Sequence, residues 1–80
     1  MIIRCVVEDG LIPSEKIVRI VTADGGQEEV AVSASQVRDN GLEAQVIGRE
    51  HERVLIELPR ESSSGRWRVW VRKDQVLVPA

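Results

Sequence analysis

The sequence offers few residues that could do acid–base or nucleophilic chemistry, since it contains one histidine, His51, and one cysteine, Cys5. A general acid or base needs a nucleophile or a substrate pocket within reach, and the neighbours of His51 supply neither. His51 is therefore predicted to be a solvated turn residue. Cys5 alternates with Ile3 and Val7, which predicts a protonated thiol packed in the core as a small apolar group.

Clusters of oxygen-bearing side chains give no stronger signal. The glutamates at 28–29 and 50–52 lack the spacing of a calcium loop. Residues 62–65, Ser-Ser-Ser-Gly, lack the lysine and the following helix of a phosphate-binding loop, and they predict a flexible hairpin tip. One cysteine cannot form an intramolecular disulfide or a cysteine-based metal cluster. The sequence therefore predicts no catalytic residue, no metal and no cofactor, and it gives little support to an enzyme.

The segment 66–72, Arg-Trp-Arg-Val-Trp-Val-Arg, is the exception. Strand alternation places Trp67, Val69 and Val71 on the inner face and the other side chains outside. Tryptophan and arginine are enriched where proteins bind partners, and the same pair can stack on bases and contact phosphates. The candidate binding residues are Arg66, Arg68, Trp70 and Arg72, together with Leu55 of the preceding strand.

Length and composition limit the architecture. Eighty residues with 42% hydrophobic and 30% charged side chains predict one folded domain over residues 1–80 rather than a disordered chain. A net charge of −2 gives no overall attraction to nucleic acid or to anionic membranes. The apolar start of the chain is too short for a signal peptide or a membrane span, and a single cysteine favours a reducing compartment. We therefore expect a soluble, cytoplasmic protein.

An internal echo organises the chain. The pattern V-x-V-x-x-x-Q-V occurs at 30–37 and again at 69–76, an offset of 39 residues. At the same offset, three alternating residues of the first half match three of the second, namely Ile3, Cys5 and Val7 with Leu42, Ala44 and Val46. The echo predicts two similar halves, 1–39 and 40–80, related by duplication or pseudo-symmetry.

Each half is predicted to contain three strands. Valine and isoleucine dominate the apolar runs and turn residues interrupt them at short intervals, which favours strands over helices. The predicted strands are residues 2–8, 15–22, 28–33, 42–48, 52–59 and 66–72. Asn40-Gly41 forms the turn between the halves, and a single 3₁₀ turn is expected at 35–38 and at 74–76.

Antiparallel pairing predicts the register of both hairpins. The predicted cross-strand pairs are Glu57 with Arg68, Leu55 with Trp70, Arg19 with Glu29, and Ile17 with Ala31. On the predicted strand 52–59, alternation places Val54, Ile56 and Leu58 on the inner face. Such pairs fix register and contribute about 0.2–1 kcal/mol each.

Six short strands cannot form two well-covered sheets, so a bent sheet closed into a small barrel is the expected arrangement. The stretch from Gly65 through Val76 resembles the end of an SH3-like barrel, where a 3₁₀ turn precedes the last strand. This resemblance implies an all-β, six-stranded SH3-like barrel made of two three-stranded meanders. It implies no binding residues, because the sequence has two such ends and neither Tyr nor Phe for an aromatic peptide groove.

Three functions remain open. The first is a protein-binding or adaptor module that uses the outward Trp/Arg face, including self-association through it. The second is single-stranded nucleic-acid binding by a small barrel, which the net acidity disfavours. The third is a subunit that completes a site in a larger complex. No membrane partner is expected.

Overall fold

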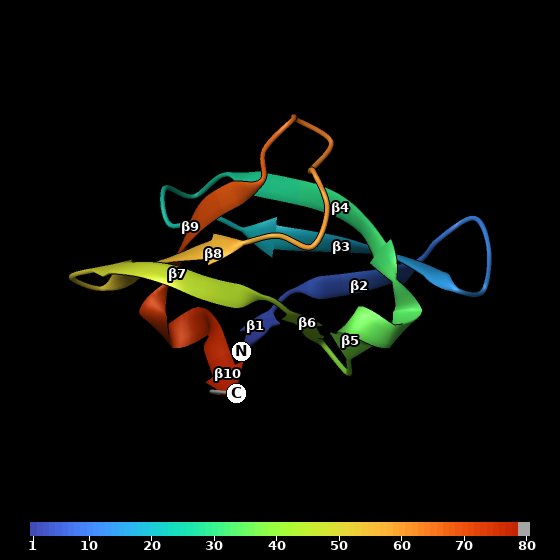
Figure 1. Ribbon diagram of the computed structural model, residues 1–80, viewed down its shortest axis with the longest axis horizontal. Coiled ribbons are helices and arrows are strands. Elements are labelled where there is room, and N and C mark those ends of the chain that lie inside the picture. The colour runs from blue at the N-terminus through green and yellow to red at the C-terminus, as the bar shows by residue number, and fades with distance from the viewer. Residues whose placement is uncertain (79–80) are drawn as a thin grey trace.

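The computed structural model describes residues 1–78, which form short strands joined by turns (Figure 1). Most strands are rich in valine and isoleucine, whose branched side chains favour extended backbone. In chain order the elements are β1 (Ile2–Arg4), β2 (Val6–Asp9), β3 (Glu15–Val21), β4 (Gln27–Ser33), η1 (Ala34–Gln36), β5 (Val37–Arg38), β6 (Gly41–Glu43), β7 (Gln45–Glu50), β8 (Arg53–Glu57), β9 (Arg68–Arg72), η2 (Lys73–Gln75) and β10 (Val76–Val78).

The strands form three sheets, with the orders β10-β1-β6-β5, β2-β3-β4 and β7-β8-β9. The all-β class is therefore confirmed. The expected closed barrel of six strands is wrong, because ten strands are divided among sheets of which none closes on itself. The finer resemblance to an SH3-like barrel has no support in this topology.

Two predicted strands, 2–8 and 42–48, are each interrupted once, and the interruptions explain the separate sheets. The N–H of Cys5 donates to the carbonyl of Asn40, and the N–H of Ala44 donates to the carbonyl of Met1, both at 2.9 Å. At these two residues the chain changes partners: β1 pairs with β6, whereas β2 pairs with β3.

The two 3₁₀ turns lie one residue earlier than predicted, and they explain the glutamine of the echo. Gln36 Oε1 accepts a hydrogen bond from the N–H of Ser33, and Gln75 Oε1 accepts one from the N–H of Arg72. The strands that follow, β5 and β10, were not predicted. Each pairs with the first strand of the other half, β5 with β6 and β10 with β1.

The ends of the predicted strands also differ in places. The strand expected at 52–59 ends at Glu57, shortly before Pro59, which has no N–H to donate to a sheet. The strand expected at 66–72 begins at Arg68. Both differences lie where the chain leaves β8 and returns to β9.

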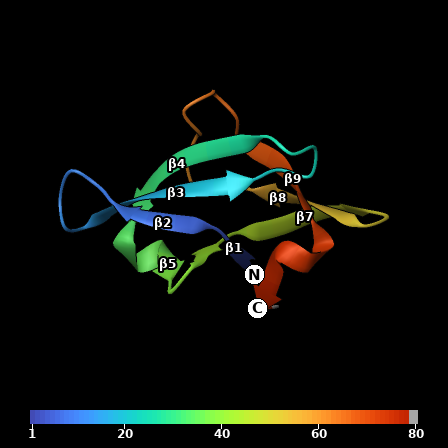
Figure 2. The same cartoon turned by 180° about the vertical axis from the view of Figure 1, so that it is seen from behind.

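Both halves supply the core. Its buried residues are Ile3, Cys5, Val18, Ile20, Val30, Val32, Leu42, Ala44, Val54, Ile56, Leu58, Val69 and Val71. The inward direction predicted for Cys5 is thus confirmed, as are those predicted for Val54, Ile56, Leu58, Val69 and Val71. The inward placement predicted for Trp67 is wrong. β4 and β9 lie side by side in both views (Figures 1 and 2). The N–H of Ala23 donates to the carbonyl of Trp70, and that of Ser63 to the carbonyl of Glu29, so the two three-stranded sheets are joined there.

Candidate functional site

The outer face of β8 and β9 carries most of the side chains that the sequence predicts to bind a partner. Leu55 lies opposite Trp70 and Glu57 lies opposite Arg68, as predicted. The side chains between them along each strand are buried, so these residues point away from the core. The register predicted for the first half is also confirmed, for the pairs Arg19–Glu29 and Ile17–Ala31.

Trp70 is half-buried, and part of its cover is a charged group. The guanidinium of Arg53 lies over the indole ring, 4.4 Å from the ring centroid, in the geometry of a cation–π contact. Arg53 was not among the predicted site residues. Its position two residues before Leu55 on the same strand places it on this face, and that spacing is the signal that could have identified it.

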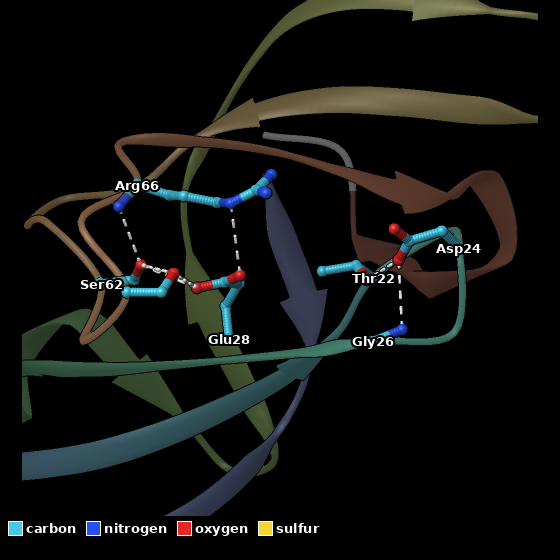
Figure 3. Close-up of polar contacts among 7 residues, drawn as sticks. Thr22, Asp24, Gly26, Glu28, Ser62 and Arg66 are labelled. Carbon is cyan, nitrogen blue, oxygen red and sulfur yellow. Dashed lines mark hydrogen bonds and ion pairs between the residues drawn. The ribbon is translucent and has the colours of Figure 1, made fainter.

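Each predicted arginine faces a carboxylate. The Nε–oxygen distances are 3.3 Å for Arg68–Glu57, 3.2 Å for Arg72–Asp74 and 3.6 Å for Arg66–Glu28. Arg68 and Arg72 lie on β9, whereas Arg66 precedes the strand and extends to Glu28 on β4 (Figure 3). The two exposed pairs, those of Arg68 and Arg72, contribute about 0–1 kcal/mol each. The positive charge of the face is therefore largely balanced by neighbouring carboxylates.

A cavity of about 150 Å³ lies beside the Trp70 ring. Its charged lining residues are Asp24, Glu28, Arg53 and Arg66. A hydrogen bond from the Thr22 hydroxyl, supported by one from the N–H of Gly26, holds the pKa of Asp24 below its usual range (Figure 3). With both acidic and basic groups in its wall, the cavity is suited to one small polar group and not to a multiply charged anion.

The Ser62–Gly65 loop is not the flexible tip that the sequence predicts, because it is bonded to β4. The hydroxyls of Ser62 and Ser64 both donate to Glu28 Oε1, at 2.8 and 2.5 Å, and Ser62 is buried (Figure 3). The hydrogen bond from Ser64 lowers the pKa of Glu28, and Ser62 and the charge of Arg66 add to this effect against the opposing effect of burial. The loop therefore links the two halves. Contacts across more than thirty residues leave no local pattern to predict them from.

Trp67 is 53% exposed instead of buried. It precedes β9, and its carbonyl accepts a hydrogen bond from the N–H of Leu58 at 2.8 Å, so it lies at the end of the core and not within it. The echo held no signal for this, because the first-half residue at the same offset, Glu28, has a side chain that is only 10% exposed. Trp67 lines a groove of about 560 Å³ together with Met1, Gln36, Leu58 and Pro59.

Neither of the two residues with potential for chemistry lines the cavity beside Trp70 or the Trp67 groove. His51 is exposed in the β7–β8 turn with a φ of 53°. Cys5 is buried, and burial raises the pKa of its thiol to about 11, so it stays protonated at neutral pH. Within residues 1–78, no three His, Cys, Asp or Glu side chains gather as metal ligands would.

The part of the chain that the structure describes contains no helix with the length and apolarity needed to span a membrane. Comparison of the chain with protein-family models, with curated proteins and with solved structures gives no match. Any function must therefore be inferred from the residues of the protein itself.

Proposed function

We propose that this protein is a non-enzymatic protein-binding module and that the outer face of β8 and β9 contacts the partner. The observation that carries the proposal is the Trp70 ring, half-buried between Leu55 and the Arg53 guanidinium and open to a cavity on one side. Protein interfaces often centre on an aromatic anchor with arginines nearby. The fold does not require this ring, because Ala31 occupies the equivalent place in the first half.

The pairing of the arginines favours a protein over a nucleic acid. A protein surface can exchange partners with Arg68 and Arg72 one carboxylate at a time, whereas a phosphate backbone would meet the carboxylates themselves. Glu57 and Asp74 lie within 3.3 Å of those guanidinium groups and would repel phosphate. Single-stranded nucleic acid is thus the second candidate.

Affinity capture with immobilised protein tests the proposal. Trp70→Ala is expected to lose the partner, because alanine removes the aromatic anchor. Ile17→Ala is the matched control, since Ile17 lies on the outer face of β3 in the first half, opposite Ala31. A partner retained equally by both variants would contradict the proposal. Sedimentation of the wild type and of Trp70→Ala tests self-association, which is excluded if both are monomers.

Titration with oligonucleotides at low salt tests the second candidate. Both tryptophans emit, so Trp67→Phe is used to leave Trp70 as the only indole. A salt-dependent change of Trp70 fluorescence would favour nucleic acid and count against the protein partner. The cytoplasmic location expected from the sequence and the alternative of a subunit that completes a larger site remain predictions.

A further inference from the structure

The two halves contain equivalent open grooves, of about 450 and 560 Å³, which differ in whether the amide of the lining glutamine donates to another part of the chain. The residues that line the grooves correspond at the offset of 39, in the pairs Asn40 and Met1, Cys5 and Ala44, Val6 and Gln45, and Gln75 and Gln36. Each groove is thus lined by the glutamine of a 3₁₀ turn, Gln36 in one and Gln75 in the other. The glutamine side chains themselves differ in what they bind.

Gln75 uses both ends of its amide. Its Oε1 accepts from the N–H of Arg72 at 2.8 Å, and its Nε2 donates to the carbonyl of Val21, the last residue of β3, at 2.8 Å. This side chain is buried. The acceptor for the Gln75 amide is therefore the end of β3, which belongs to the first half of the same chain.

Gln36 uses only one end. Its Oε1 accepts from the N–H of Ser33 at 3.1 Å, but its Nε2 has no acceptor within residues 1–78. The Nε2 is not buried, since the described residues include no buried side-chain nitrogen or oxygen without a hydrogen bond. The residues equivalent to the end of β3 are not in position, because the chain turns away at Pro59. A donor is thus left facing a groove.

The groove lined by Gln36 and Trp67, called the Trp67 groove, also presents apolar side chains beside this donor. Trp67 is 53% exposed there, and Pro59 and Met1 are half-buried. No lysine or arginine side chain lines it within the described chain, whereas Glu43 and Glu57 do. The groove is therefore unsuited to phosphates and compatible with a neutral or basic segment of polypeptide.

We infer that the Trp67 groove binds an extended apolar segment of a protein partner, with a backbone carbonyl that accepts from Gln36 Nε2. The template is the chain itself: Val21 ends an extended strand and presents its carbonyl to the equivalent amide of Gln75. An apolar side chain of the segment would contact the face of Trp67. Such a segment would be held by one side-chain-to-backbone hydrogen bond and by apolar contact with Trp67, and not by addition of a strand to a sheet edge.

This groove shares no lining residue with the cavity beside Trp70, and Glu57 is the residue that it shares with the outer face of β8 and β9. A displayed library of random linear peptides, selected on the wild-type protein, tests the inference. Apolar peptides are expected to be enriched. Trp67→Ala should weaken their binding by roughly tenfold or more, as loss of an aromatic anchor does.

Gln36→Glu isolates the hydrogen bond. Glutamate keeps the oxygen that accepts from Ser33 but has no N–H to donate, so the 3₁₀ cap remains while peptide binding weakens. Cooperative thermal unfolding of each variant verifies that it folds. Trp70→Ala should bind the peptides like the wild type.

Three results would overturn the inference. The first is a selection without enrichment, and the second is a set of peptides that bind Trp67→Ala and Gln36→Glu as tightly as the wild type. The third is binding that Trp70→Ala abolishes and Trp67→Ala does not, which would place the peptide on the β8–β9 face and support the proposed function alone.

Discussion

The two long hairpins of the protein project towards opposite ends of its longest dimension, 38 Å, and end in loops of different chemistry (Figure 1). In the β2–β3 loop, Leu11 is 97% exposed and Ile12 is 56% exposed. The β7–β8 turn consists of His51 and Glu52, both polar and exposed. The two equivalent hairpins thus have the same antiparallel strand pairing but different side chains at their tips.

The interior shows the opposite relation. Ile3 and Leu42, equivalent at the offset of 39, are both fully buried, and they lie opposite each other where β1 pairs with β6. Cys5 and Ala44 break their strands with the same hydrogen bond to the other half. The comparison teaches that the fold restricts the residues where the halves meet and leaves the outer residues free to differ. The outer residues that differ between the two halves are therefore the better candidates for a binding function.

The largest expected effect comes from the shared interior. Ile3→Ala and Leu42→Ala should each lower the free energy of unfolding by about 2–5 kcal/mol, because each removes a fully buried side chain from one core. Urea unfolding followed by fluorescence measures both. We expect one cooperative transition with similar losses. Two separate transitions, or a loss confined to one variant, would break the equivalence of the halves.

The next largest effect is expected at the two glutamines, whose substitution should lower the free energy of unfolding by different amounts. Gln75→Ala leaves the Arg72 N–H and the Val21 carbonyl without partners and should cost about 1–3 kcal/mol. Gln36→Ala removes one bond to a half-buried residue and should cost about 0.5–1.5 kcal/mol. The same urea titration compares them. Equal losses would mean that Gln36 makes a second bond in solution.

Glu28 tests the loop that joins the halves. Glu28→Gln should cost about 1 kcal/mol at neutral pH, because the charged acceptor of two serine hydroxyls is lost. Because the folded-state pKa of Glu28 is lowered below the usual 4.5, its stabilisation is complete above 4.5 and is lost as the pH falls through the lowered value.

The difference in stability between the wild type and Glu28→Gln should therefore shrink on acidification. Glu29→Gln is the control, since Glu29 is half-exposed and paired with Arg19 on the outer face. A difference that does not change with pH would contradict the role given to the carboxylate.

The smallest effect is expected at the hairpin tips. Leu11→Ser should change the free energy of unfolding by no more than about 0.5 kcal/mol, since the side chain is almost wholly exposed. Glu52→Ser at the other tip should behave alike. A clear loss for Leu11→Ser would show that a second copy or another segment covers this tip in solution, and sedimentation would separate the two.

Much of the fold could be predicted from alternation and the echo, because a strand on the core repeats its side chains with a period of two. The register of Leu55 with Trp70 followed from that period. The change of sheet at Cys5 did not, since Ile3, Cys5 and Val7 keep alternating while the backbone N–H changes its partner. Because the alternation is the same on both sides of Cys5, it does not show that the Cys5 N–H bonds to Asn40.

The candidate site was predictable in part for the same reason. Alternation placed Trp70 on the outer face of β9, but it could not show that β9 begins at Arg68, and so it placed Trp67 in the core. The contact of Arg53 with the Trp70 ring depends on rotamers, and the bonds from Ser62 to Glu28 depend on tertiary structure. Local spacing places Arg53 on the outer face of β8, but it does not encode these contacts.

The crossing of β5 and β10 between the halves has a consequence for synthesis. β1 is translated before the other described strands, yet one of its two neighbours in the four-stranded sheet is β10, made of Val76–Val78. Until that strand emerges, one edge of β1 has open backbone groups that can bind another nascent chain. The four-stranded sheet can therefore be completed only after β10 has been translated.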